Sequence, residues 1–215
     1  MWTDLKDIVK PEHTALIIVD MQKDFCVEGF RCVEAGRDIR SVQRIIPTLC
    51  QLLNAARQKE VLVIHVCWLT LPDHLSDSGP WLAQRRRSTY SSEFVAIEGT
   101  EGGEVIEELA PVKGEVIILK HRYSGFTSTN LDLVLRSNSI RSLIITGLST
   151  NICVESTLRD AVELDYYVVL PKDCTASWSE KLYESTLENV KHRFGHVCTL
   201  IDILHIWGVE LSMNL

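Results

Sequence analysis

The sequence lacks several features by which well-known protein classes are recognised. Its seven cysteines form no CxxC or CxxH pair, so a structural zinc site is not expected. No apolar run approaches the roughly 20 residues that span a bilayer, which argues against a membrane protein. The 22 basic residues are outnumbered by 29 acidic ones, which gives a net charge of −7. Nucleic acids and anionic membranes both attract basic surfaces, so neither is an expected partner.

The composition that is present is that of an ordinary globular protein. The chain has 215 residues, 46% of them hydrophobic and 24% charged, which excludes a disordered or low-complexity polymer. This length predicts a single domain over residues 1–215. An odd number of scattered cysteines is not typical of a disulfide scaffold. We therefore predict a reducing, cytoplasmic location, in which free thiols are available for chemistry.

Short apolar runs rich in β-branched residues alternate with segments of helical period. Continuous apolar runs are typical of strands that are covered on both faces, as in a parallel sheet. The predicted fold class is therefore α/β, a doubly wound, mostly parallel six-stranded sheet with helices on both faces. The six predicted strands are Ala15–Val19, Val61–Val66, Glu115–Leu119, Ser142–Thr146, Tyr167–Leu170 and Val197–Ile201.

Four segments between these runs carry apolar residues at helical spacing. We expect Pro47 in the first turn of the first of them, where proline is tolerated. The four predicted helices are Ile45–Ala56, Leu131–Leu135, Cys153–Leu164 and Leu182–Val190.

The stretch Leu71–Gly103 shows no strong periodicity and contains several glycines and prolines. We predict a long loop that acts as a lid or an interface arm, with a surface excursion without a role as the alternative. The one basic run, Arg85, Arg86 and Arg87, lies within it. A solvated face is the favoured interpretation, and contact with a carboxylate-bearing substrate or a partner subunit is the alternative.

Three chemically distinct groups follow the ends of predicted strands, where open α/β sheets bind their ligands. Asp20 ends the first strand, Lys120 ends the third, and Cys153 opens a helix six residues after Gly147. A helix N-terminus and a nearby lysine both favour a thiolate, and a carboxylate can carry the thiol proton to a leaving amine. Each residue alone is more often structural. Their joint placement predicts acyl transfer from an amide, with backbone N–H groups of the turn Gly147–Cys153 facing an oxyanion.

The residues around these three groups form longer motifs in a fixed order. They read ALIIVDMQKDF at Ala15–Phe25, KHRYSGF at Lys120–Phe126 and GLSTNICVESTLRDA at Gly147–Ala161. Together they resemble the family of isochorismatase-like cysteine hydrolases, over a stretch from about Thr14 to Ile201. The resemblance implies an isochorismatase-like fold, a small-molecule substrate and a homo-oligomer, either a dimer or a tetramer.

The resemblance also implies roles for individual residues. Asp20 corresponds to the general base, Lys120 to the third member of the triad and Cys153 to the nucleophile. A cis peptide bond is implied between Leu148 and Ser149, which would make the N–H groups of Ser149 and Cys153 an oxyanion hole. The implied reaction is attack of Cys153 on a carbonyl, loss of ammonia or an amine, and hydrolysis of the thioester.

Departures from the family patterns bear on the substrate. Nicotinamidases of this family carry an Asp-x-His pair and a further His that bind a metal, whereas Asp73 and His74 are adjacent here. No metal and no cofactor are therefore expected. Isochorismatases proper lack the cysteine, so Cys153 argues against that activity. The string STNICVEST at 149–157 resembles the branch that acts on ureidoacrylate, biuret and carbamoylsarcosine.

The function predicted is that of a metal-independent cysteine amidohydrolase of small ureido, carbamoyl or amide compounds. The alternatives are another hydrolase on this scaffold, nicotinamidase-like or acting on ethers or esters, and a catalytically silent binding protein. Candidate substrate-binding residues are Gln22, Phe25, Trp68 and Tyr123, because they follow the strand ends. Phe25 packed at the sheet edge and Trp68 in the core are equally acceptable interpretations.

Overall fold

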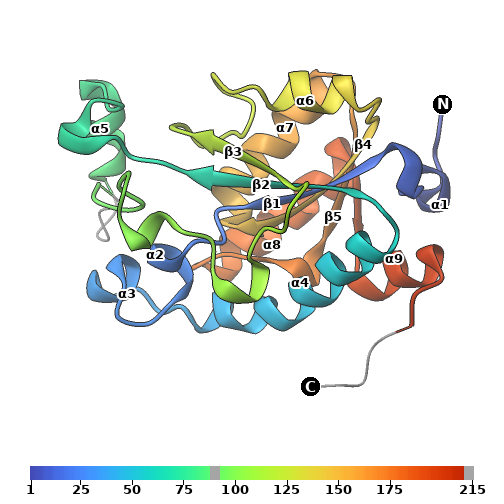
Figure 1. Cartoon of the computed structure of the whole chain (residues 1–215), viewed down its shortest axis with the longest axis horizontal. Coiled ribbons are helices and arrows are strands. Elements are labelled where there is room, and N and C mark those ends of the chain that lie inside the picture. The colour runs from blue at the N-terminus through green and yellow to red at the C-terminus, as the bar shows by residue number, and fades with distance from the viewer. Residues whose placement is uncertain (88–92, 211–215) are drawn as a thin grey trace.

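The computed structural model describes residues 1–87 and 93–210, and within them the central sheet has seven strands. The order along the sheet is β3-β2-β1-β4-β5-β7, every pairing is parallel, and the short β6 pairs with the end of β4. Helices lie on both faces, so the predicted fold class is confirmed (Figure 1). The strands are β1 (Thr14–Val19), β2 (Leu62–Trp68), β3 (Val116–Lys120), β4 (Ser142–Leu148), β5 (Tyr167–Pro171), β6 (Thr175–Ala176) and β7 (His196–Cys198).

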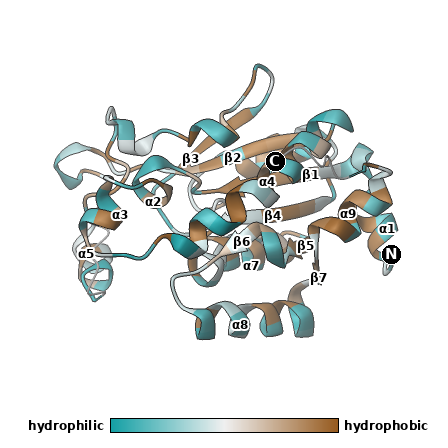
Figure 2. Ribbon diagram, turned by 90° about the horizontal axis from the view of Figure 1, so that it is seen from below, coloured by the Kyte–Doolittle hydropathy of each residue, from teal (hydrophilic) through white to brown (hydrophobic). Residues whose placement is uncertain are grey.

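The two central strands, β1 and β4, account for the continuous apolar runs in the sequence. All residues of β1 and of β4 are buried, because helices cover both faces of the sheet there. Apolar residues are concentrated in these strands and on the inward faces of the helices (Figure 2). Val19 pairs with Gly147 and Trp68 pairs with Lys120, so four neighbouring strands end at the same edge of the sheet.

The last predicted strand is only partly right. β7 ends at Cys198, and Leu200 and Ile201 form the first turn of a helix. The Thr199 hydroxyl accepts a hydrogen bond from the N–H of Asp202, whose carboxylate accepts one from the N–H of Thr199. This capping box begins the helix in spite of the apolar sequence.

The four predicted helices are present. α4 and α9 lie on one face of the sheet and α6 and α7 on the other (Figure 1). α4 begins at Arg40, so Pro47 lies inside the helix and not in its first turn. Pro47 is exposed, which leaves the carbonyl of Gln43 open to water. The longer helices are α4 (Arg40–Gln58), α6 (Leu131–Ser137), α7 (Glu155–Glu163), α8 (Glu180–Asn189) and α9 (Leu200–Trp207).

Shorter helical segments connect these elements. None of the helices within residues 1–87 and 93–210 combines the length and the apolar character needed to cross a membrane. The short α-helices are α1 (Leu5–Ile8), α2 (Lys23–Cys26), α3 (Arg31–Glu34) and α5 (Gly79–Arg85); 3₁₀ turns are Pro11–His13, Pro72–His74, Glu101–Gly103, Glu107–Leu109 and Lys172–Cys174; π-helical turns are Thr150–Val154 and Val190–Phe194.

The segment Leu71–Gly103 is more ordered than predicted. It contains α5, which Ser78 caps by accepting a hydrogen bond from the N–H of Trp81, with Pro80 in the first turn. Residues 88–92 of this segment lie outside the described residues. A continuous loop was therefore the wrong prediction, and the Ser-Gly-Pro start of α5 is the signal that was missed.

Candidate active site

The structure brings the three predicted groups together at the carboxyl edge of the sheet. The Nζ of Lys120 donates a hydrogen bond to Oδ2 of Asp20 over 2.8 Å. The thiol of Cys153 lies beside both side chains and interacts with each of them. All three residues are buried, with Lys120 completely so. A carboxylate, an ammonium and a thiol therefore meet in a site that excludes most water.

Different elements deliver these side chains. Asp20 follows β1 with a positive φ of 52°, and its backbone N–H donates to the carbonyl of Val66. Lys120 is the last residue of β3, which is separated from β1 by β2. Its Nζ lies 4.6 Å from the ring centroid of Trp68, at the end of β2. Only a long side chain can pass the end of the intervening strand, which explains why the cation here is a lysine.

Cys153 lies in the π-helical turn Thr150–Val154 that precedes α7. The peptide bond between Leu148 and Ser149 is cis. The carbonyl of Ser149 accepts hydrogen bonds from the N–H groups of Ile152 and Val154, which are the neighbours of Cys153 on either side. Ser149 and Cys153, at the two ends of this tight turn, line the same cavity.

Hydrogen bonds from two sides hold the turn that carries Cys153. Oδ1 of Asn151 accepts from the hydroxyls of Ser149 and Ser177. The hydroxyl of Thr157 donates to the carbonyl of Cys153 and accepts from the N–H of Gly125, which belongs to the KHRYSGF motif. The second and third sequence motifs are therefore joined through Thr157 directly behind Cys153.

Gly147 allows the ends of β1 and β4 to approach closely. It has a φ of +93°, and a Cβ added there would overlap the carbonyl oxygen of Val19. No other residue type fits both the backbone conformation and the space. Gly147 therefore fixes the distance between the strand that ends beside Asp20 and the strand that leads to Cys153.

Burial dominates the electrostatics of the site. Loss of water raises the pKa of Asp20 above its ordinary value, in spite of the adjacent Lys120. The neighbouring carboxylate and thiol raise the pKa of Lys120 and outweigh its own burial. Burial and the charge of Asp20 raise the pKa of Cys153 as well. The lowered thiol pKa expected from the helix N-terminus is therefore wrong, because the thiol is almost fully removed from water.

Asp20 has one oxygen available for the thiol proton. Its Oδ2 accepts from Lys120, whereas its Oδ1 is buried and has no hydrogen-bond partner in the described part of the chain. A buried carboxylate oxygen without a donor is unfavourable and calls for a functional explanation. The carboxylate of Asp20 interacts with the thiol of Cys153, so this free oxygen suits a proton acceptor.

A cavity of about 350 Å³ opens above these groups. Phe25, Trp68 and Tyr123, three of the four residues for which substrate binding is predicted, line it. Its further lining includes residues that sequence reasoning did not assign to the site, namely Arg37, Gln84, Arg87, Leu148, Ile152 and Trp178. It also includes Arg85, from the basic run.

Gln22 was predicted to bind substrate, and the structure contradicts this. Its side chain is fully buried, and Oε1 accepts from the backbone N–H of Trp68 over 2.8 Å. Its Nε2 donates to the carbonyls of Trp68 and Gly103, each over 2.8 Å. Gln22 therefore ties the end of β2 to the segment that leads back to the sheet, and it has no donor left for a ligand.

None of the histidines is among the residues that line the cavity of Cys153 in the described part of the chain. Nε2 of His65 is 3.2 Å from Glu115, and burial lowers its pKa. Nδ1 of His121 contacts the carbonyl of Leu69, and Nδ1 of His74 contacts Asp77. Across residues 1–87 and 93–210, no three His, Cys, Asp or Glu side chains are grouped to hold a metal ion.

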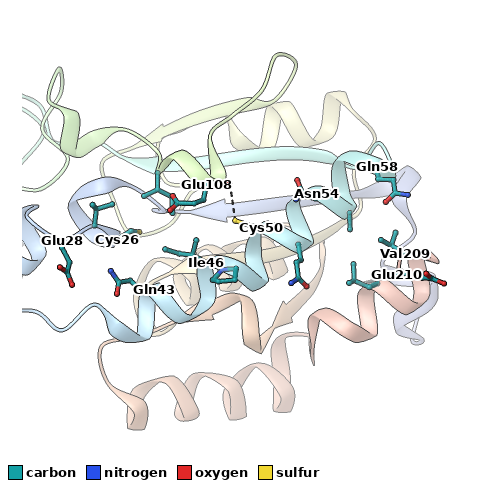
Figure 3. Close-up of a pocket in the computed structure, with 16 residues that line it drawn as sticks. Cys26, Glu28, Gln43, Ile46, Cys50, Asn54, Gln58, Glu108, Val209 and Glu210 are labelled. Carbon is teal, nitrogen blue, oxygen red and sulfur yellow. Dashed lines mark hydrogen bonds between the residues drawn. The ribbon is translucent and has the colours of Figure 1, made fainter. Parts of the chain in front are cut away.

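A second and larger cavity, of about 850 Å³, lies along α4 (Figure 3). It also contains thiols, those of Cys26 and Cys50, and the Cys50 thiol donates to the carbonyl of Glu108. Burial raises the pKa of both thiols, and the charge of Glu108 raises it further. The candidate active site is therefore the smaller cavity, where a lysine and a proton acceptor adjoin the sulfur.

Comparison with known proteins agrees with this geometry. The isochorismatase domain family matches residues 14–202. Ureidoacrylate amidohydrolase RutB of Agrobacterium fabrum is 36% identical over 205 residues, which cover 90% of each chain. RutB of an Enterobacter species is also 36% identical, over 89% of this chain and 88% of that protein.

Solved structures show the same likeness. A cysteine hydrolase from Pseudomonas syringae pv. phaseolicola superposes with a TM-score of 0.82 at 29% identity, covering 94% of this chain and 95% of that one. N-carbamoylsarcosine amidase from Thermoplasma acidophilum gives a TM-score of 0.71 at 26% identity, covering 87% and 96%.

Proposed function

The chain belongs to the isochorismatase family, as its three motifs indicated, and from this premise we propose that it is a cysteine amidohydrolase of small ureido or carbamoyl compounds. The observation that carries the proposal is the contact of Asp20, Lys120 and Cys153 at the base of a cavity. The similarity to ureidoacrylate amidohydrolases and to N-carbamoylsarcosine amidase supports the substrate class.

In the first step the sulfur of Cys153 bonds to the carbonyl carbon while its proton passes to Asp20. The raised pKa of Asp20 suits it to accept this proton. Negative charge moves from the carboxylate of Asp20 to the carbonyl oxygen, and the N–H groups of Ser149 and Cys153 stabilise it there. Lys120 stays an ammonium, since its pKa is raised. It stabilises negative charge on its two neighbours, Asp20 and Cys153. The thiol of Cys153 is thus neutral at rest, and Asp20 takes its proton while the sulfur attacks an electrophile in the cavity.

In the second step Asp20 returns the proton to the leaving nitrogen. The C–N bond breaks, ammonia or an amine departs, and a thioester to Cys153 remains. Water then attacks the thioester with Asp20 as the base, the C–S bond breaks, and the thiol is restored with release of the acid. Every proton taken by Asp20 is given back within the cycle, so no further acid is required.

The test is an ammonia- and amine-release assay over ureidoacrylate, biuret, carbamoyl amino acids and nicotinamide, with and without a chelator. We expect turnover of ureido or carbamoyl compounds that a chelator does not reduce, and that Cys153→Ser abolishes. Turnover of nicotinamide alone, or loss of activity with chelator, would replace the proposal by a nicotinamidase-like function. Absence of turnover for the whole panel would favour an ether or ester hydrolase or a silent binding protein.

We also propose that the chain forms a homo-oligomer, as the family resemblance implied. Ile117 and Leu119 lie on β3, at the edge of the sheet, and each is 52% exposed. A second copy of the chain would remove these apolar side chains from water. Sedimentation velocity on the full chain tests this, and a monomer at every concentration would contradict it.

A cytoplasmic location is a further proposal. All seven cysteines are free thiols in the structure, which supports a reducing compartment. Cell fractionation of the source organism is the test, and recovery of the chain outside the cytoplasmic fraction would contradict the proposal.

A further inference from the structure

Arg85, the last residue of α5, carries a buried charge that is only partly neutralised. Its side chain is 0% exposed. Nη1 lies 3.4 and 3.5 Å from the two oxygens of Asp77, while Nε and Nη2 are buried with no hydrogen-bond partner among the described residues. Unpaired donors of a buried cation are costly, so this arrangement calls for a ligand.

Asp77 does not neutralise Arg85 fully. Its Oδ2 is held by Nδ1 of His74 over 2.8 Å, a shorter contact than either of those to Arg85. Asp77 therefore fixes the direction of the guanidinium through Nη1. The opposite edge of the guanidinium, made by Nε and Nη2, has no hydrogen-bond partner among the described residues.

Arg85 is one of the residues around the cavity above Cys153. Its Cζ lies 5.1 Å from the ring centroid of Trp68. Nζ of Lys120 lies 4.6 Å from the same ring. Trp68 is therefore in contact with the cation of the candidate triad and with that of Arg85.

The charges that line the cavity have one dominant sign. Its acidic residue is Asp20, which Lys120 already pairs, whereas Arg37, Arg85 and Arg87 are all cationic. In a chain whose net charge is −7, this is a local concentration of positive charge. Such a cavity attracts anions and disfavours cationic substrates.

We propose that Arg85 binds the carboxylate of the substrate through Nε and Nη2, and so makes the enzyme specific for ureido acids over neutral ureas. The inference rests on the proposed function and adds its specificity residue. Two parallel N–H donors match the two oxygens of a carboxylate. A two-carbon spacer puts the carboxyl carbon about 5 Å from the carbamoyl carbon, since four bonds separate them. Cys153 and Arg85 then hold opposite ends of one substrate.

The test compares ureidoacrylate with its neutral methyl ester, following cleavage of the carbamoyl group by mass spectrometry. The wild type is expected to favour the acid by about 100-fold in kcat/KM, and Arg85→Gln to remove that preference by lowering the acid value alone. Arg85→Lys keeps the charge without the two-donor edge, so an intermediate loss is expected. Arg86→Gln is the matched control, because the Nε of Arg86 binds Glu93 over 3.0 Å and the residue does not line the cavity.

Two results would overturn the proposal. One is an equal loss on acid and ester in Arg85→Gln with a lowered Tm, which would show a structural role. The other is a wild type that cleaves ureidoacrylate and its methyl ester equally well. That result would agree with the proposed cysteine chemistry but would show that the enzyme does not select for a carboxylate.

A binding experiment distinguishes a failure of this inference from a failure of the proposed function. Calorimetry on Cys153→Ser is expected to show ureidoacrylate binding that the added Arg85→Gln change weakens at least tenfold. That result would support Arg85 as the carboxylate site even if the wild type cleaved neither compound. Equal affinity with and without Arg85 would refute the proposal whatever the turnover.

Discussion

Two cavities of this molecule, the one along α4 and the one above Cys153, contain cysteine thiols, and they differ in what surrounds the sulfur. The larger one, along α4, places Cys26 and Cys50 near the carboxylates of Glu28 and Glu108. The smaller one places Cys153 between Asp20 and Lys120 and under three arginines. Carboxylates alone oppose thiolate formation, whereas a carboxylate paired with an ammonium can take the proton and hold the charge. Neighbouring charge, and not cavity size, therefore distinguishes the site that we propose as the reactive one.

The largest expected effect is that of removing the sulfur of the smaller cavity. Cys153→Ala should lower kcat by about 10⁴-fold or more, because no other group can form the acyl intermediate. Steady-state ammonia release measures this, with circular dichroism to show that the fold is kept. A variant that retains full activity would contradict the assignment of the nucleophile.

Asp20→Asn should lower kcat by about 10² to 10⁴-fold, since proton transfer then lacks its acceptor. The wild-type rate should fall at acidic pH as Asp20 becomes protonated, with a midpoint above the ordinary aspartate pKa of 3.8, because burial raises the pKa. A pH profile of kcat measures the midpoint. Asp73→Asn, at an exposed position, is the control and should leave the profile unchanged. A wild-type midpoint at or below 3.8 would argue against a buried base.

A smaller effect is expected from replacing Gln22, whose side chain binds the backbone of Trp68 at the end of β2. Gln22→Ala should lower the free energy of unfolding by about 3 kcal/mol, because the buried N–H and C=O of Trp68 lose their partners. Urea denaturation measures this. Gln43→Ala, at an exposed position beside the larger cavity, should change stability by less than about 0.5 kcal/mol. Equal values for the two variants would contradict the structural role of Gln22.

The smallest expected effect is in the larger cavity. Cys50→Ala should change kcat by less than about twofold, because its thiol only donates to the carbonyl of Glu108. The same ammonia-release assay measures it. A loss comparable with that of Cys153→Ala would erase the distinction between the two cavities.

Much of the site could be predicted because it depends on strand ends. Long buried runs located β1 and β4 well, and the residues that follow them necessarily meet at one edge of a parallel sheet. Asp20 and Cys153 were therefore placed by topology alone. Lys120 was placed in the same way, although its reach past Trp68 is visible only in three dimensions.

Other features depend on burial, which the sequence does not reveal. Arg85, Arg86 and Arg87 look alike as a run, yet Arg85 is buried in the cavity and its two neighbours are exposed. The position of Gln22 after Asp20 suggested a ligand contact, but its amide is consumed by the backbone of β2. The prediction of a lowered pKa for Cys153 was wrong for the same reason. It took account of the helix N-terminus but not of the burial of the thiol, which raises the pKa.

Alkylation by iodoacetamide, mapped by mass spectrometry, tests most directly whether Asp20 and Lys120 activate one sulfur among seven. We expect Cys153 to be labelled first and fastest, and Asp20→Asn to remove that advantage. Slow and equal labelling of all seven thiols in the wild type would contradict the account.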